Sequence, residues 1–335
     1  MTRFLLDDQI ASQPEAVRDA LRRTEPPQLD PERPLVFTGI GTSLHACRVA
    51  AAWTAEITEG RLRPHAVETH EFALRGGIQA GDQIVVVSHR GTKRFPTALL
   101  DRAKAVGASS VTVTGFGAER VAGDVVLRTC ADETSMTHTV SYVSALAVLG
   151  RLIARLAGKR GEALTRALES APEAQERTLA LPAPVRAAEQ VHEREPILVT
   201  GFGLDAITAQ ETALKIKEAA YAWSEGMSVE QALHGPPAAY DGRRAAITIT
   251  PPHDDGERTA QLRGLLQEIG VTALTCGDAD EDLPFAPVHP LARPLVAVIP
   301  LQRLSAEMAR LRGTNPDKIR TDAEPWASAM RRVRL

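Results

Sequence analysis

The sequence lacks a surplus of charge of either sign. Its 39 lysines and arginines stand against 42 aspartates and glutamates, which gives a formal net charge of -3 at pH 7. A protein held on nucleic acid or on an anionic membrane by its overall field needs a basic surplus. We therefore expect neither nucleic acid nor membrane as a partner, and any phosphate that the chain binds must be captured locally.

Cysteine is scarce, and its spacing indicates neither zinc nor redox chemistry. Cys47, Cys130 and Cys276 are odd in number, lie far apart and form no C-x-x-C pair. The opening segment, MTRFLLDDQIASQPEAVRDAL, also lacks the uninterrupted apolar core of a signal peptide or a membrane span. We expect a protein of a reducing compartment, the cytoplasm.

The length and composition predict two globular domains. The chain has 335 residues, of which 44% are hydrophobic and 24% charged, and this is enough for two cores of ordinary size. Residues 3–24 alternate apolar and charged positions at helical spacing, and the prolines of PPQLDPERP then interrupt the chain. This pattern predicts an N-terminal helix followed by a linker.

Short apolar, β-branched runs alternate with helical stretches in the first half. The runs are 34–41, 65–73, 83–91, 109–115 and 124–130. Strands that are apolar on both faces and alternate with helices are typical of a parallel sheet covered on both sides. The first half is therefore predicted to be an α/β domain.

The same pattern restarts after a mostly helical segment at 141–193. A glycine turn and a helix at 205–223 follow the first of the new apolar runs, which are 196–203, 245–252, 272–277 and 295–300. GIGTS at 39–43 is matched by GFGLD at 201–205, so we interpret the chain as a duplicated α/β domain. The predicted divisions are a helix and linker at 1–30, domains at 31–180 and 181–312, and a tail at 313–335 that closes over the site.

The turn GIGTS has the composition of a phosphate-binding turn. Ligands of parallel α/β sheets bind beyond the carboxyl ends of the strands, where helix N-termini offer unpaired N–H groups. Gly41 lets the backbone approach a ligand, and the hydroxyls of Thr42 and Ser43 can join the amides. The turn lacks the lysine of a P-loop and the third glycine of a dinucleotide site. A plain strand-to-helix turn with a Thr or Ser N-cap fits the same letters.

A second loop of this kind follows the strand predicted at 83–87. Its polar side chains are those of Ser88, His89, Arg90, Thr92 and Lys93. Hydroxyls and cations can contact a phosphate together, with arginine as the bidentate partner. A solvated basic turn is the alternative, but two such loops at adjacent strand ends favour anion binding.

Several motifs follow one another along the chain. They are G-x-G-T-S at 39–43, V-E-x-x-E-F at 67–72, S-H-R-G-T-K at 88–93, E-x-S-M at 133–136, A-x-E-x-A-L-K-x-K-E at 209–218, H-G-P at 234–236, I-P-L-Q at 299–302 and G-x-N-P-D-x-x-R at 313–320. Their order resembles the sugar isomerase (SIS) family, and within it the isomerase half of glucosamine-6-phosphate synthase and its deaminase and deglycase relatives.

This resemblance implies a fold and a class of ligand. The implied fold is two tandem SIS domains, each a parallel sheet flanked by helices in a flavodoxin-like three-layer αβα arrangement. The implied ligand is a sugar phosphate or amino sugar phosphate, bound by the two loops described above. By the same resemblance, Glu133 and Ser135 join the substrate-binding residues.

Three charged residues share one face of the helix at 205–223. Glu211, Lys215 and Glu218 are spaced i, i+4 and i+7. Such a stripe is usually a salt-bridged surface, but the abundance of Ala, Leu and Ile in this helix suggests that it is enclosed. The resemblance implies substrate-binding roles for Glu211 and Lys215 and makes Glu218 the carboxylate that moves a proton between two neighbouring carbons through a cis-enediol.

His234 precedes the Gly-Pro of H-G-P. It matches the histidine with which the family opens the sugar ring, and in the family this loop comes from a neighbouring subunit, so a homodimer is implied. Without that context, a histidine in a proline-rich loop is most often an exposed turn residue. The chemistry needs only a carboxylate and an imidazole, so we expect no metal and no organic cofactor.

The chain departs from the family pattern at several positions. It has no amidotransferase half, so we do not expect a self-contained synthase. His89-Arg90 and Thr92-Lys93 stand where the family has Gln-Ser and Glu-Thr, and His138 and Val140 change a wall of the implied site. Glu324 stands where synthases carry the Schiff-base lysine, and Lys318 is the only lysine of the tail.

Three functions fit these observations. The first is isomerisation, with or without deamination, of a hexose or amino sugar phosphate. The second is cleavage of a phosphorylated sugar–amine adduct, as in the deglycase branch. The third is a sugar-phosphate sensor that keeps the fold without the chemistry, which the altered loop and the missing lysine favour.

Overall fold

The computed structural model describes residues 2–119, 121–278 and 280–333. The chain forms two compact units, each built around one sheet. The first-sheet unit comprises Gln13–Glu133, Val140–Pro172 and the chain from Ser328. The second-sheet unit comprises the chain up to Ser12, Thr134–Thr139 and Glu173–Ala327. The main division thus falls after Pro172, inside a helix, whereas the sequence predicted it near residue 180.

The first sheet has five parallel strands in the order β2-β1-β3-β4-β5. The strands are β1 (Leu35–Gly39), β2 (His65–Glu68), β3 (Gln83–Val87), β4 (Ser109–Thr114) and β5 (Val125–Arg128). This order is that of flavodoxin-like doubly wound folds. It confirms the α/β class and the parallel sheet expected for the first half.

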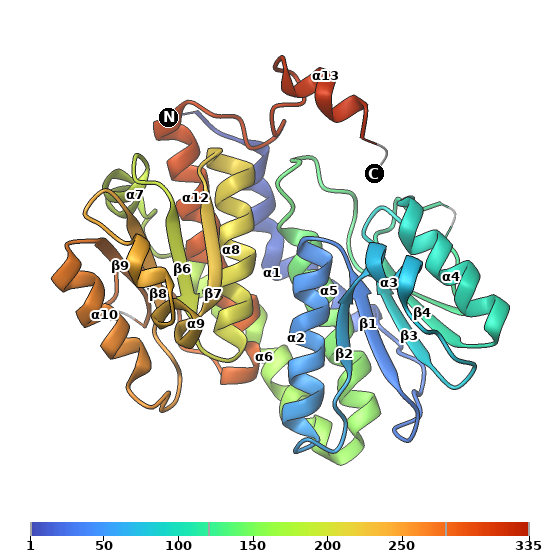
Figure 1. Ribbon diagram of the computed structural model, residues 1–335. Coiled ribbons are helices and arrows are strands. Elements are labelled where there is room, and N and C mark those ends of the chain that lie inside the picture. Colours follow the sequence, from blue (N-terminus) through green and yellow to red (C-terminus); the bar gives the residue numbers. More distant parts are fainter. Residues whose placement is uncertain (1, 120, 279, 334–335) are drawn as a thin grey trace. The chain divides into compact units, whose positions relative to one another are not determined.

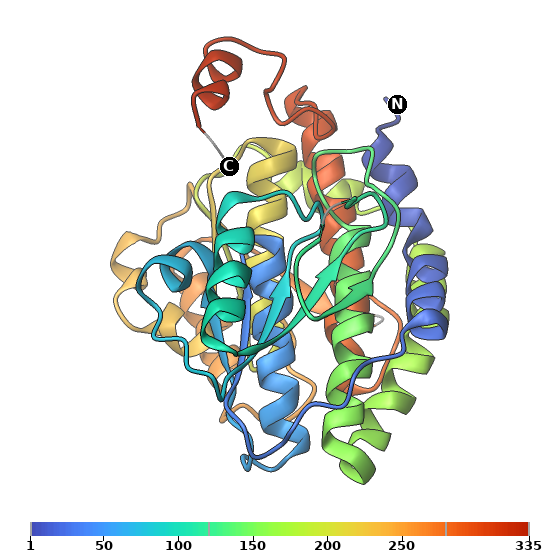
Figure 2. The ribbon, with the colours of Figure 1, turned by 90° about the vertical axis from the view of Figure 1, so that its right-hand side faces the viewer.

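Helices cover both faces of this sheet (Figure 1). α2 (Thr42–Ile57) packs with α5 (Val140–Ala157) on one face, and α3 (Thr69–Arg75) packs with α4 (Arg94–Val106) on the other. Figure 2 looks onto this unit from the α4 side, with the sheet behind α4 and with α2 and α5 farther back. Because both faces are covered, every residue of β3 is buried.

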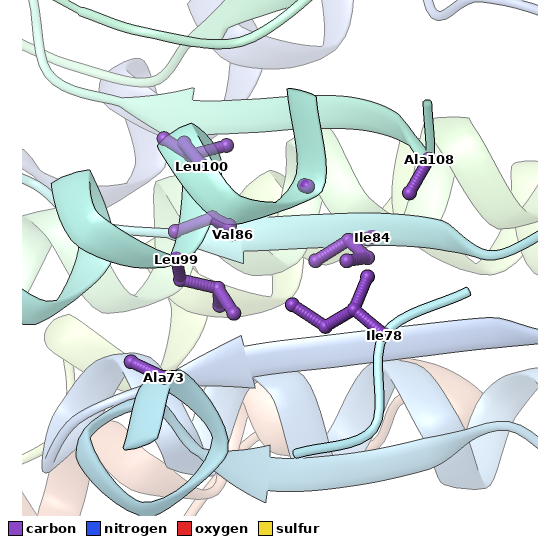
Figure 3. Packing of buried hydrophobic residues seen from close by; sticks show 8 residues of the cluster. Ala73, Ile78, Ile84, Val86, Leu99, Leu100 and Ala108 are labelled. Carbon is purple, nitrogen blue, oxygen red and sulfur yellow. The ribbon is translucent and has the colours of Figure 1, made fainter. Parts of the chain in front are cut away.

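The core between this sheet and α4 follows from two sequence periods. Alternate residues of β3, Ile84 and Val86, point to one face, where Leu99 and Leu100 of α4 meet them. Figure 3 shows these side chains interlocked, with Ile78 closing the side next to Ile84. Burying each such side chain stabilises the fold by about 1.5–3 kcal/mol.

The second sheet repeats the first, in the order β10-β9-β8-β6-β7. Its parallel strands are β6 (Ile197–Gly201), β7 (Ser224–Ser228), β8 (Ala245–Ile249), β9 (Thr272–Gly277) and β10 (Leu283–Pro284). The edge strand β7 reads SEGMS and has no apolar pattern. A Cβ at Gly226 would lie 2.4 Å from the backbone of the neighbouring helix, so close packing rather than hydrophobicity selects this strand.

Helices also cover both faces of the second sheet (Figure 1). One face carries α7 (Val185–Val191), α8 (Leu204–Ala220) and α12 (Val298–Arg312), and the other carries α9 (Val229–Leu233) and α10 (Arg258–Ile269). α8 ends three residues before the predicted Trp223, because Tyr221 takes a left-handed conformation with φ 54°. This sheet and its helices confirm the predicted repeat of the α/β pattern.

One predicted strand is wrong. The apolar run 295–300 is helical, in α11 (Arg293–Val296) and the start of α12. All six residues of the run are buried, and a short run that is apolar on every side has no period that separates strand from helix. The run 65–73 is likewise only half strand, since Glu68 ends β2 and its side chain accepts a hydrogen bond from Glu71 N at the start of α3.

The helical segments outside the sheets agree with the predicted pattern. α1 spans Leu5–Arg23, and α5 leads through a 3-10 turn into α6 (Glu162–Leu179). By length and composition, the stretch Val140–Leu179 could cross a membrane, with a mean hydropathy of 1.5 in its most apolar window. Since 83% of that window is buried inside the protein, the stretch is packed as a core helix.

The predicted tail, from residue 313, is attached to the N-terminal helix within the second-sheet unit. Asp317 accepts hydrogen bonds from Leu5 N at 2.8 Å and from Leu6 N at 3.0 Å, and so satisfies two amides of the first turn of α1. Only α13 (Trp326–Arg331) follows. The G-x-N-P-D segment therefore has a structural function in addition to any part in a site.

Candidate functional site

The first-sheet unit has a topological switch point between β1 and β3. These strands are neighbours, with Thr38 paired to Val86, so the turns that follow them leave the sheet at adjacent positions. The helix after β1 lies on one face and the helix after β3 on the other. Ligands of doubly wound folds bind at this point, beyond the carboxyl ends of the strands. The structure therefore brings together the two loops that the sequence singled out.

The turn after β1 requires its glycines. Gly41 has φ 57° and ψ -127°, and a Cβ at Gly39 would lie 2.6 Å from the backbone of Ser43. Gly41 is the N-cap of α2, and of the amides that follow it Ser43 N donates to the Ile40 carbonyl at 3.2 Å. Thr42 and Ser43 are the first two helical residues, and both are partly exposed. The turn thus presents two hydroxyls at the N-terminus of α2.

The turn after β3 carries two cations that are close to each other. Burial and the neighbouring charge of Arg90 lower the pKa of Lys93. In the described part of the chain, neither side chain forms an ion pair with a carboxylate. Lys93 is the N-cap of α4 and forms no side-chain cap, and Thr92 before it is exposed. Two adjacent like charges at a helix N-terminus form a local anion-binding feature.

Ser88 and His89 lie deeper than the cations. Ser88 is buried, and its carbonyl accepts hydrogen bonds from Gly91 N at 3.1 Å and from Thr114 Oγ1 at 2.7 Å. The His89 ring lies against Gly115, where a Cβ would come within 2.7 Å of it. Burial lowers the pKa of His89, against the charges of Glu133 and Asp132, and Arg90 lowers it further. His89 is therefore a neutral group near the end of β4.

Glu133 and Ser135 have structural partners. The Glu133 carboxylate accepts hydrogen bonds from Val140 N at 3.2 Å and Ser141 N at 2.7 Å, at the start of α5. Ser135 is 1% exposed, and its hydroxyl donates to the Pro316 carbonyl at 3.3 Å. These bonds explain the residue types without a ligand. The substrate-binding roles that the resemblance implies for them stay predictions.

Helix α8 of the second-sheet unit carries the predicted charged stripe on its enclosed face. Lys215 Nζ lies 2.5 Å from Glu218 Oε2 and 3.5 Å from Glu211 Oε1. The Glu211 and Lys215 side chains are 0% and 1% exposed, whereas that of Glu218 is 24% exposed. A surface salt-bridge stripe is thereby excluded. Of the three charged groups, only the Glu218 carboxylate is open to a ligand.

The second glycine turn has the same backbone conformation as the first, but its side chains differ. Gly203 has φ 58° and ψ -122°, close to the values at Gly41. Asp205 stands where the first turn has Ser43, and its carboxylate pairs with Arg293 at 2.8 Å, with both side chains buried. Arg293 also donates to the Thr250 carbonyl at the end of β8. The second-sheet unit thus holds an internal anion at its own switch point.

His234 lies at the surface of the second-sheet unit. It is the C-cap of α9, with φ -110° and ψ 90°, and its side chain is 70% exposed. Gly235 follows with φ 101°, a conformation that only glycine adopts easily, and Pro236 begins the next 3-10 turn. The H-G-P letters therefore specify a sharp turn that leaves the imidazole accessible.

Residues 28–155 match the family model of the SIS domain. This chain is an SIS-domain protein. It is 27% identical to a glutamine–fructose-6-phosphate aminotransferase (isomerizing) of Thermococcus kodakarensis over 96% of the chain, and 29% identical to that of Methanothermobacter thermautotrophicus over 94%. The SIS-domain protein spans 57% and 56% of the length of these two relatives.

Solved structures share the fold of both units of the SIS-domain protein. The C-terminal domain of glucosamine-fructose-6-phosphate aminotransferase from Francisella tularensis superimposes with a TM-score of 0.85 at 20% identity, covering 94% of this chain and 98% of that domain. Glucosamine-6-phosphate deaminase from Thermotoga maritima gives 0.77 at 18% identity, over 94% and 97% of the two chains. Tagatose-6-phosphate ketose/aldose isomerase from Escherichia coli gives 0.76 at 16%, over 93% and 95%.

Sequence reasoning did not identify the internal anion of this SIS-domain protein. The alignment of GIGTS with GFGLD was the available signal, because it places an acidic residue, Asp205, at the position of the Ser43 hydroxyl. Its partner Arg293 is 88 residues away, and no local pattern links the two. Within residues 2–119, 121–278 and 280–333, no group of three His, Cys, Asp or Glu side chains is arranged to hold a metal ion.

Proposed function

We propose that this SIS-domain protein is a phosphosugar isomerase-type enzyme that acts on a hexose or amino sugar phosphate. The observation that carries the proposal is the state of Glu218, a carboxylate that is 24% exposed and held from one side by a buried lysine. A general base must be held in place and still be within reach of the substrate.

Phosphate binding is assigned to the first-sheet unit. The amides that follow Gly41, the hydroxyls of Thr42 and Ser43, and the cations Arg90 and Lys93 would share the charge of a monoester. The second glycine turn is a poor alternative, because the Asp205 carboxylate would repel an anion there. The proposed ligand therefore carries a single phosphate.

Proton transfer is assigned to Glu218. Its carboxylate would take the proton from the carbon next to the carbonyl of the open-chain sugar, leaving a cis-enediolate. The same group would return the proton to the former carbonyl carbon, while a hydroxyl proton moves to the other oxygen, so that an aldose becomes a ketose or the reverse. Lys215 would keep the carboxyl group oriented through both transfers.

The similar proteins support the class of substrate. The names of the compared aminotransferases, deaminase and isomerase all refer to hexose or amino sugar 6-phosphates. Reactions of these names change two neighbouring carbons, one with the carbonyl and one with a hydroxyl or an amine. Transfer to this chain is part of the proposal, since identity to the relatives and solved structures is below 30%.

Glu218→Gln tests the assignment. We expect kcat on a panel of hexose and amino sugar phosphates to fall by about 10²–10⁴-fold, the usual contribution of a general base. Binding of the same ligands, measured by calorimetry, should be kept because the change is isosteric. Glu189→Gln, an exposed carboxylate of α7, is the matched control. Unchanged turnover in Glu218→Gln would show that the assignment is wrong.

The same panel separates the competing functions. Release of an amine or amino acid from a phosphorylated sugar–amine adduct, lost in Glu218→Gln, would assign a deglycase. A rise in Tm with sugar phosphates, with no product from any of them, would assign a sensor. Interconversion of aldose and ketose phosphates, with or without ammonia, is the result that we expect.

We further propose a homodimer in which His234 acts in the site of the neighbouring subunit. Its exposed imidazole, which would pass a proton to or from the sugar ring oxygen, supports this arrangement. Glu218→Gln and His234→Ala should each be inactive alone. After subunit exchange in an equal mixture, about half of the dimers are mixed, and one of the two sites in each mixed dimer is intact. The mixture should therefore recover about a quarter of the wild-type activity. No recovery would contradict the shared site.

We also propose the cytoplasm as the compartment. Cys47, Cys130 and Cys276 are free thiols and are buried, as expected for a protein that folds under reducing conditions. Fractionation of the native source cells, followed by immunodetection, tests this proposal, and recovery in the secreted or membrane fraction would contradict it.

A further inference from the structure

The side chain of Glu230 joins His234 to a second helix. Glu230 Oε1 lies 2.8 Å from His234 Nε2, and its other oxygen, Oε2, lies 2.9 Å from the guanidinium of Arg258 at the start of α10. Arg258 also reaches Oε1 at 3.2 Å. An exposed pair of two side chains is held weakly, but here the carboxylate has fixed contacts on both oxygens. Its orientation toward the imidazole is thereby defined.

The backbone around His234 is defined as well. A capping box between Ser228 and Gln231 fixes the start of α9, with each side chain bonded to the backbone of the other. His234 N donates to the Gln231 carbonyl at 3.2 Å, and the left-handed Gly235 ends the turn. The imidazole and the carboxylate therefore belong to one small rigid turn, and they would move together with it.

The protonation of this pair follows from its chemistry. The hydrogen bond from His234 is the largest cause of a lowered pKa of Glu230, and the charge of Arg258 adds to it. An ionised carboxylate can only accept hydrogen bonds. The bonded nitrogen, Nε2, must then carry the proton, and in the neutral ring the lone pair is on Nδ1.

We propose that Glu230 is the positioning residue of His234, which holds the ring as the Nε2–H tautomer and leaves Nδ1 as the atom that exchanges a proton with the sugar. This inference rests on the role proposed for His234. It adds the reactive atom and the group that selects it. In ring opening, Nδ1 takes the proton of the anomeric hydroxyl, the bond between the anomeric carbon and the ring oxygen breaks as the carbonyl forms, and Nδ1 returns the proton to the ring oxygen. Nε2 keeps its own proton throughout.

The tautomer can be observed without any substrate. In two-bond ¹H–¹⁵N spectra of the full ¹⁵N-labelled protein, the His234 ring signals are those that disappear in His234→Ala. We expect a protonated Nε2 and an unprotonated Nδ1 once the ring is neutral. Glu230→Gln, whose amide can donate or accept, should give a mixture of tautomers. Glu173→Gln removes a comparable exposed pair, with Arg177 at 2.9 Å, and should leave the spectrum unchanged.

Kinetics of the same variants complete the test. Glu230→Gln should lower kcat by about 10-fold or more with a smaller change in KM, as expected when a proton-transfer group is misoriented rather than lost. A wild-type ring protonated at Nδ1, or a Glu230→Gln spectrum identical to wild type, would overturn the inference. Unchanged turnover in His234→Ala would instead remove the proposed role of His234, whatever the spectra show, so the two failures are distinguishable.

Discussion

The ammonium of Lys215 lies 2.5 Å from a carboxylate oxygen of Glu218, one helical turn away. The lysine is enclosed and the glutamate is partly open, so this pair links the interior of the second-sheet unit to a ligand-accessible carboxylate. Glu211 lies 3.5 Å from the same ammonium and is fully buried. A single cation therefore compensates two carboxylates, one fully buried and one partly exposed.

Lys215→Met is expected to destabilise the protein strongly. The variant would leave the buried Glu211 carboxylate without its cation, and breaking a buried pair in this way costs about 3–5 kcal/mol. Urea denaturation followed by circular dichroism measures the change in free energy of unfolding. Lys217→Met on the same helix is the control, because Lys217 is partly exposed and lies over the exposed ring of Trp223. We expect a change below about 1 kcal/mol. Equal losses in both variants would contradict this account.

Asp205→Asn should be destabilising for the complementary reason. It would leave the guanidinium of Arg293 buried without a carboxylate, at a cost of about 3–5 kcal/mol. The double variant Asp205→Leu with Arg293→Met removes both charges and should be much less destabilised than either single change. Thermal unfolding of the wild type, Asp205→Leu, Arg293→Met and the double variant closes this cycle, and purely additive losses would show that the pair is not coupled.

Arg90→Met and Lys93→Met should weaken phosphate binding. Each variant removes one cation from the turn after β3, and a hydrogen bond to a charged group contributes about 1.5–3 kcal/mol, so affinity for a sugar phosphate should fall by about 10- to 100-fold. The loss should shrink at high salt, since these cations are only partly buried. Calorimetric titration measures both effects. Lys104→Met, at the far end of α4, should bind like wild type.

His89 predicts a decrease in stability at acidic pH. Its pKa in the folded protein lies below the ordinary value of 6.5, chiefly because of burial. As the pH falls below 6.5, histidine in the unfolded chain takes up a proton while His89 in the folded chain stays unprotonated. The free energy of unfolding therefore declines until the pH reaches the folded pKa. His89→Gln should flatten this decline between pH 6.5 and pH 5. An unchanged slope in chemical denaturation would contradict the assignment.

Strongly periodic parts of the fold were predictable from local sequence. The apolar run of β3 and the amphipathic α4 pack against each other through Ile84, Val86, Leu99 and Leu100. This packing was predictable because side-chain direction repeats every second residue in a strand and every third or fourth residue in a helix. The run 295–300 was not predictable in the same way. It is apolar on every side, so its local pattern does not separate a helix from a strand.

The candidate site was predictable in part for a related reason. The stripe of Glu211, Lys215 and Glu218 follows from helical spacing. Whether the stripe is a surface salt bridge or an enclosed group depends on burial, which the spacing does not predict. Likewise, GFGLD has the turn geometry of GIGTS. Only the contact with Arg293, which is 88 residues away along the chain, shows that Asp205 belongs to an internal ion pair.

The amino-acid order by itself determined the two strand–glycine–helix repeats, the glycine turns and the spacing of the charged residues on α8, because these depend on interactions within a few residues. The tertiary structure alone decided which of those charges are buried and which glycine turn keeps an internal anion. These outcomes depend on desolvation and on partners brought from distant segments, and neither is encoded in local spacing.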